Sequence, residues 1–116
     1  MTIHTENKVW GMAKNPLDTA RTCGGSSGGD AGLVGGLCVP LAIGSDLAGS
    51  LRIPAAFTGV KSFKPTPGRV SLEGWLMVLR NRGISPPPLK FISASPGPIA
   101  RSVSDLLMVF KLMLHP

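Results

Sequence analysis

Two glycine-rich turns constrain this chain more than any other feature of its sequence. Residues 24–29 read GGSSGG, and residues 44–50 read GSDLAGS. Glycine lets backbone N–H groups turn inward and approach a bound group closely, which most side chains prevent. A serine on such a turn presents its hydroxyl next to N–H donors. An acyl-transfer enzyme needs a nucleophile and an oxyanion hole side by side, so the two turns indicate that chemistry.

Short apolar segments follow the turns and predict short helices and strands. In chain order we expect a helix over residues 31–37 capped by Asp30, a strand over 39–43, a helix over 50–57 ended by Gly59, and a strand over 60–63. Further on we expect a strand or helix over 75–79, a loop over 84–88, a strand over 89–92 and a turn over 95–98.

The strongest helix signal lies near the C-terminus. Ser102 and Asp105 have the spacing of a capping box, which predicts a helix over residues 103–114. Apolar residues recur along it at helical spacing and predict a stripe that faces the core: Val103, Leu106, Leu107, Phe110, Met113 and Leu114.

Composition argues against several classes of function. Lys and Arg number 12 against 6 Asp and Glu, but the basic residues are scattered, only 5% of residues are aromatic and Tyr is absent. We therefore expect no nucleic-acid partner, because such a surface clusters charge and offers stacking platforms. Cys23 and Cys38 are too few for a disulfide framework or a zinc site, so we expect no metal or other cofactor and an intracellular location. Neither a signal peptide nor an apolar run of transmembrane length is seen.

Several blocks together resemble the amidase signature family, serine hydrolases that cleave the carbon–nitrogen bonds of amides. The blocks are residues 24–29, residues 46–54, residues 64–69 and residues 97–103, in the order and spacing of the family. Within the family the chain is more similar to the fatty-acid-amide-hydrolase-like branch. The resemblance implies an α/β fold with a mixed sheet flanked by helices. Because family domains are much larger, we expect residues 1–116 to form a partial domain with an incomplete core.

The resemblance also implies roles for residues in the two turns. Ser50 resembles the nucleophile that forms the acyl-enzyme, and Ser26 resembles the bridging serine, which the family holds on a cis peptide bond. The remaining roles fall on two groups: the oxyanion-hole N–H donors Leu47, Ala48, Gly49 and Ser50, and the supporting residues Asp46, Arg52 and Ser27. A small-molecule or lipid amide is the implied substrate, with peripheral membrane association of the full-length protein as a further expectation.

Two departures from the family pattern concern the catalytic base and the oxyanion turn. The family's catalytic lysine lies further toward the N-terminus than residue 1, so we expect the isolated chain to be inactive. Ala48 stands where the family usually has glycine, and an alanine forced to a positive φ would be strained by roughly 1–2 kcal/mol.

Other interpretations remain open at this point. The chain could be an inactive remnant that acts only as a binding or structural module. Ser26 and Ser27 could be ordinary turn hydroxyls, and Ser50 could be a helix N-cap. A phosphate-binding loop is disfavoured, because Asp30 follows the glycines where a P-loop has lysine.

Overall fold

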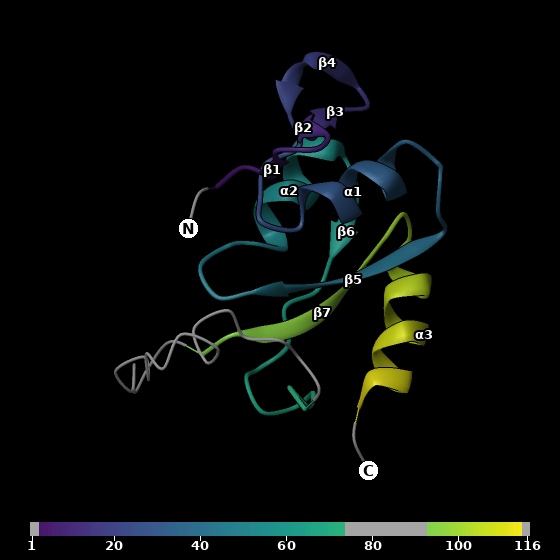
Figure 1. Cartoon of the computed structure of the whole chain (residues 1–116). Helices are drawn as coiled ribbons and strands as arrows, with labels where there is room; N and C mark the ends of the chain where they lie inside the picture. Colours follow the sequence, from purple (N-terminus) through teal and green to yellow (C-terminus); the bar gives the residue numbers. More distant parts are fainter. Residues whose placement is uncertain (1–2, 74–92, 115–116) are drawn as a thin grey trace, which may run out of the picture.

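A small antiparallel sheet forms the centre of the computed structural model, which describes residues 3–73 and 93–114. Its strands are β5 (Leu41–Asp46), β6 (Lys61–Ser62) and β7 (Ser95–Ala100), in the order β5-β7-β6 (Figure 1). β5 pairs with β7 along its whole length, from Leu41 opposite Ala100 to Asp46 opposite Ser95. β6 pairs with the last two residues of β7. The expected α/β class is confirmed.

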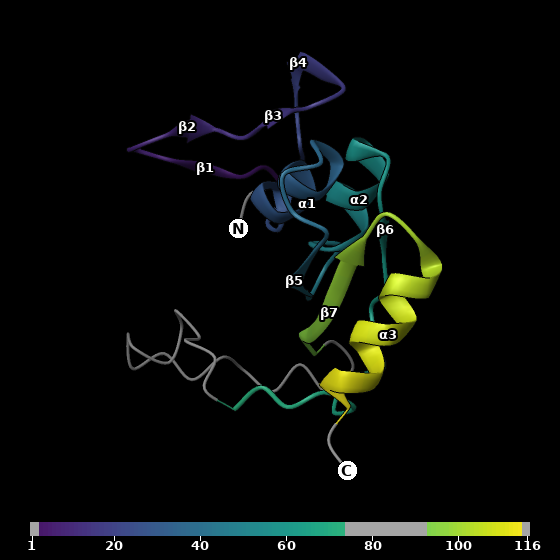
Figure 2. The same cartoon turned by 90° about the vertical axis from the view of Figure 1, so that its right-hand side faces the viewer.

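Three helices pack on this sheet. α1 (Gly28–Gly35) and α2 (Arg52–Thr58) lie together on one side of the sheet, and α3 (Val103–Met113) packs against β7 and β6 (Figure 2). The core between α1, the second turn and the sheet consists of Ala31, Val34, Leu51 and Ile99, all completely buried. This core fixes the glycine-rich turns, because each turn leads directly into one of these packed segments.

Two short hairpins precede the first glycine-rich turn. β1 (Glu6–Asn7) pairs with β2 (Gly11–Met12), and β3 (Lys14–Asn15) pairs with β4 (Asp18–Thr22), both antiparallel. Figure 1 shows them above α1 and α2, away from the sheet. The sequence predicted neither hairpin. They matter for the site because the chain runs from β4 straight into the turn at residues 24–29.

The first two helices begin at positions that differ from the prediction. α1 begins at Gly28 with Ser27 as its N-cap residue, so Asp30 lies in the first turn and is not the cap. α2 begins at Arg52 with Leu51 as N-cap, so Ser50 is outside the helix and does not cap it. The predicted end of α2 is confirmed, because Gly59 adopts a left-handed φ of 71°. Neither Ser26 nor Ser50 is therefore the N-cap residue of the helix that follows it.

The strand predictions are correct in place but wrong in extent. The strand expected over 39–43 is β5, which begins two residues later and continues to Asp46, so the first three residues of the expected turn at 44–50 belong to the strand. The strand expected over 60–63 is β6 and has two residues. The turn expected over 95–98 is wrong, since Ser95–Ala100 is the central strand β7. The Phe63 N–H donates to the Pro98 carbonyl oxygen at 3.1 Å, so the polar edge of Pro98 faces the short β6. The missing proline N–H groups therefore do not interrupt the long pairing with β5.

The C-terminal helix agrees with its predicted cap but only partly with its predicted burial. The Ser102 hydroxyl accepts a hydrogen bond from the Asp105 N–H at 3.1 Å, as a capping box requires. Leu106 is buried, but Val103 is 66% and Leu107 52% exposed. The stripe is therefore only half covered, because no described element packs over the outer part of α3. Large apolar side chains left exposed along one helix fit the expectation of an incomplete core.

The elements expected over 75–79, 84–88 and 89–92 lie outside the described residues. Within the described parts of the chain, no helix is long and apolar enough to cross a membrane.

Candidate active site

One buried carboxylate organises the second glycine-rich turn. Asp46 ends β5 and is completely buried, and its two oxygens accept backbone N–H groups from Gly49 at 2.7 Å, Leu51 at 3.1 Å and Arg52 at 3.3 Å. The Arg52 guanidinium adds a two-point contact, at 2.9 Å from Nε and 3.0 Å from the terminal nitrogen. These bonds hold the chain on both sides of Ser50. Asp46, with Arg52 bound to it, therefore holds the backbone of this turn in place.

The electrostatics of this carboxylate agree with its geometry. Burial alone would raise the pKa of Asp46, because a low dielectric disfavours the charged form. The hydrogen bonds from the Arg52 side chain and from the three N–H groups outweigh burial and hold the pKa of Asp46 well below its ordinary value. Asp46 also raises the pKa of the Arg52 guanidinium. Asp46 is thus a fixed anion and not a proton carrier.

The turn between Asp46 and Ser50 corrects one of the expected oxyanion donors. The Gly49 N–H already donates to Asp46, so it is directed at that carboxylate and not at a substrate oxygen. The N–H groups of Leu47, Ala48 and Ser50 are the remaining members of the expected set. Gly49 also takes the positive φ of the turn, at 115°, whereas Ala48 is not in the left-handed region. The strain that was foreseen at Ala48 is therefore absent.

The first turn brings Ser26 and Ser27 against the second. The peptide bond between Gly25 and Ser26 is cis, as the family resemblance implied. The Ser27 N–H donates to the Ser50 carbonyl oxygen at 3.1 Å, and the Ser27 hydroxyl lies 3.5 Å from the Ser45 carbonyl oxygen. The two turns are thereby joined through backbone groups next to both candidate catalytic serines.

The two candidate catalytic hydroxyls differ from Ser27 in being unused. Ser26 is exposed and Ser50 half-buried. Within residues 3–73 and 93–114, neither hydroxyl takes part in a hydrogen bond, whereas the Ser27 hydroxyl bonds the backbone. An unused, accessible hydroxyl on a rigid turn can take part in chemistry, whereas one committed to the fold cannot.

A comparison with known proteins identifies the chain. The sequence profile described as Amidase matches residues 1–116. The chain belongs to the Amidase family.

Individual relatives agree with this identification. A glutamyl-tRNA(Gln) amidotransferase subunit of Legionella pneumophila is 44% identical over 108 residues, which are 93% of this chain and 20% of the relative. A solved amidase superimposes with a TM-score of 0.81 at 39% identity, over 97% of this chain and 24% of its own. A solved fatty acid amide hydrolase gives 0.83 at 33% identity, over 96% and 18%.

The chain thus spans about a fifth of the length of the curated relatives that it matches. Amidotransferase subunits and other amidases stand beside the fatty acid amide hydrolase among these relatives. The comparisons support the Amidase family and do not support its fatty-acid-amide-hydrolase-like branch in particular.

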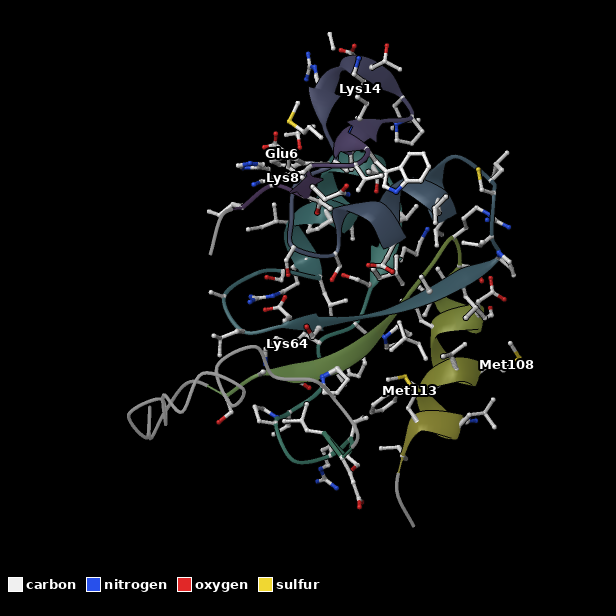
Figure 3. All side chains as sticks on the ribbon, in the orientation of Figure 1. Glu6, Lys8, Lys14, Lys64, Met108 and Met113 are labelled. Atoms are coloured by element: carbon white, nitrogen blue, oxygen red, sulfur yellow. The ribbon has the colours of Figure 1, made fainter. Side chains whose placement is uncertain are left out.

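No lysine in the described residues of this Amidase chain forms a hydrogen bond with Ser26 or Ser50. Lys8 follows β1 and Lys14 lies in β3, so both belong to the hairpins, and Figure 3 shows Lys64 well away from Lys8 and Lys14. The Lys61 ammonium donates to the Arg101 carbonyl oxygen at 2.9 Å, and the Lys64 ammonium to the Pro65 carbonyl oxygen at 3.4 Å. The described residues therefore supply no lysine that is hydrogen-bonded to Ser26.

The sequence did not single out Thr5, which contacts the first turn directly. Its hydroxyl lies within hydrogen-bonding distance of Gly24, Ser26 and Gly28. The polar stretch before the turn gave no periodic signal, and the contacts join residues far apart in sequence. No local sequence signal could therefore have pointed to it.

The described residues offer no cluster of three His, Cys, Asp or Glu side chains that could hold a metal ion. Cys23 lies just before the first turn, where burial raises the pKa of its thiol. Its Sγ donates to the Lys14 carbonyl oxygen at 3.1 Å. A thiol that is kept protonated and turned toward backbone is a structural element and not a nucleophile.

Proposed function

We propose that this chain supplies the serine part of an amide-hydrolysing site. Ser50 is the nucleophile, Ser26 passes its proton onward, and a lysine from polypeptide outside these 116 residues is the base. Asp46, Arg52 and Ser27 hold the turns that carry the two serines. The activity of the full-length protein is then hydrolysis of a carbon–nitrogen amide bond.

The observation that carries the proposal is the backbone arrangement around Ser50. The Asp46 carboxylate binds N–H groups on both sides of Ser50. The Ser50 carbonyl oxygen accepts a hydrogen bond from the Ser27 N–H of the neighbouring turn at 3.1 Å. Such a scaffold holds a hydroxyl in one place without using it. Preorganisation of this kind lowers the barrier, because no group has to be reoriented when the reaction occurs.

The proposed reaction follows the residues in order. The Ser50 oxygen attacks the amide carbonyl carbon while its proton moves to Ser26, and the proton of Ser26 moves to the neutral lysine. The developing oxyanion is held by N–H groups of the turn, from the set Leu47, Ala48 and Ser50. When the carbon–nitrogen bond breaks, the proton returns through Ser26 to the leaving nitrogen. Water then cleaves the acyl ester and restores the Ser50 hydroxyl.

The lysine requirement separates this proposal from an inactive binding or structural module. The isolated chain should not react with a fluorophosphonate, because Ser50 has no base. The full-length protein that contains this chain should react at Ser50. Reaction of the isolated chain would contradict the requirement for an outside lysine, whereas lack of reaction in both would favour the inactive module.

The substrate class is a finer proposal. The expectation from sequence was a small-molecule or lipid amide, fatty acid amides among them. The relatives include subunits of a glutamyl-tRNA(Gln) amidotransferase and a 1-carboxybiuret hydrolase. Hydrolysis by the full-length protein should be compared for short primary amides and long-chain acyl amides, with Ser50→Ala as the blank. Preference for the long chains, together with binding to phospholipid vesicles, would support the lipid substrate and peripheral membrane association. Preference for short polar amides would exclude them.

A further inference from the structure

The turn that carries Ser26 is held from two opposite sides. On one side, the Ser27 N–H binds the Ser50 carbonyl oxygen at 3.1 Å. On the other side, the segment of His4 and Thr5 packs directly against the turn. A Cβ added at Gly25 would lie 2.6 Å from the His4 carbonyl carbon. The N-terminal segment is thus as close to the turn as backbone atoms allow.

Thr5 makes the polar contacts across this second side. Its hydroxyl donates toward the carbonyl oxygens of Gly24 at 3.1 Å and Ser26 at 3.0 Å, and it accepts the Gly28 N–H at 2.9 Å. A hydroxyl has one proton and two lone pairs, so the two carbonyls share the proton while the oxygen binds the N–H. One side chain therefore fastens the turn before Ser26, at Ser26 and at the start of α1.

Thr5 is itself held in place by backbone hydrogen bonds between residues that flank the hairpin strands. The Ala13 N–H donates to the Thr5 carbonyl oxygen at 2.9 Å, and the Cys23 N–H donates to the Ala13 carbonyl oxygen at 3.0 Å. This ladder connects Thr5 to the residue that directly precedes the turn. A β-branched side chain also has little freedom about χ1, so the hydroxyl stays where the backbone places it.

We propose that Thr5 is a positioning residue for Ser26. It touches no reacting atom in the proposed reaction. It fixes the carbonyl groups on either side of the Gly25–Ser26 peptide and the first N–H of α1, and so sets where the Ser26 hydroxyl lies relative to Ser50. The inference rests on the proposed proton-passing role of Ser26.

Three variants of the full-length protein separate the hydroxyl of Thr5 from its shape. Thr5→Val keeps the shape and removes the hydroxyl, Thr5→Ser keeps the hydroxyl, and Thr19→Val makes the same change on the exposed strand β4. Hydrogen–deuterium exchange of peptides spanning residues 24–31 gives a readout that does not need hydrolysis. Thr5→Val should speed this exchange by about tenfold or more, because it removes both the bond that the hydroxyl accepts from Gly28 and the proton it donates to the carbonyls. The other two variants should not change the exchange.

The second readout is the rate at which a fluorophosphonate labels Ser50. Thr5→Val should slow labelling by about 10- to 100-fold, as expected for a small misplacement of a catalytic group, and Thr5→Ser should restore it. In a Ser26→Ala background, Thr5→Val should cause no further loss, because Thr5 acts through Ser26.

Two results would overturn the proposal: unchanged exchange in Thr5→Val, or an equal slowing with and without the Ser26 hydroxyl. Full labelling of Ser26→Ala alone would instead contradict the proposed function.

Discussion

The Ser27 N–H donates a hydrogen bond to the Ser50 carbonyl oxygen over 3.1 Å. This bond joins residues more than twenty positions apart in sequence, on the two turns that carry the candidate catalytic hydroxyls. On one side of the joint Asp46 holds the Ser50 turn, and on the other Thr5 holds the Ser26 turn. Each element of this arrangement can be changed separately, and the expected results differ.

Removing the Asp46 carboxylate should destabilise the full-length protein far more than removing its charged partner. Asp46→Ala leaves three N–H groups and a guanidinium without their acceptor, so we expect a loss of roughly 3–5 kcal/mol. Arg52→Ala should cost about 1 kcal/mol, because the Arg52 side chain is 58% exposed and the three backbone N–H groups still hydrogen-bond the carboxylate. Urea unfolding midpoints measure both.

The exposed pair of Arg21 and Asp18 is the matched control for that comparison. Asp18→Ala removes a carboxylate that is 48% exposed, and it should change stability by about 0.5 kcal/mol or less. A loss in Asp46→Ala no larger than in Asp18→Ala would mean that the buried carboxylate does not organise the turn.

Acid should weaken the fold through the same residue. The pKa of Asp46 is depressed in the folded protein, so its stabilising effect is complete above the unfolded pKa of about 3.9. As pH falls below about 4, the unfolded state takes up a proton that the folded state does not, and stability declines toward the folded pKa. Asp46→Asn should be less stable at neutral pH and should lose less on acidification. Denaturant titrations between pH 7 and pH 3 test this, and parallel declines in the two proteins would contradict it.

Neighbouring glycines in the first turn of α1 should respond in opposite ways to alanine. A Cβ on Gly28 would lie 2.6 Å from the Thr5 hydroxyl oxygen, whereas a Cβ on Gly29 would meet nothing within 4 Å. Gly28→Ala should cost about 1–3 kcal/mol by overpacking. Gly29→Ala should stabilise by up to about 1 kcal/mol, because alanine favours the helix. Thermal unfolding of the pair checks both, and equal shifts would show that the N-terminal segment does not pack on the turn.

The isolated chain should lack a cooperative unfolding transition. β6 has two residues, and large apolar side chains are exposed on α3, among them Leu107 at 52% and Leu112 at 82%. Small sheets with uncovered apolar faces are marginally stable. Calorimetry of the purified monomer should show no sharp peak, and the chain should bind a hydrophobic dye. A single cooperative transition without dye binding would refute this.

Local signals made part of this structure predictable. Ser102 and Asp105 indicated the start of α3 because a cap depends on residues three positions apart. Gly59 indicated the end of α2 because glycine readily takes the left-handed φ that ends a helix. The glycine-rich turns and the support of Asp46 could be read from residue types and family spacing. Each of these features depends on a short stretch of chain.

The features that sequence missed depend on contacts between distant segments. β7 contains two prolines and looks like a turn until β5 supplies its partner from about fifty residues away. Thr5 gave no local signal, since its bonds reach residues 24 to 28. The Gly49 donor was misjudged because residue order does not say which N–H groups the Asp46 carboxylate will occupy.

The most direct test of whether Ser26 and Ser50 act together is site-resolved mass spectrometry of the full-length protein after reaction with a fluorophosphonate. We expect the adduct on Ser50, and we expect Ser26→Ala to slow its formation at least about 100-fold, the usual contribution of a positioned proton-transfer group. Thr19→Val should react at the wild-type rate. An adduct on another residue, or full reactivity without the Ser26 hydroxyl, would contradict the proposed roles of both serines.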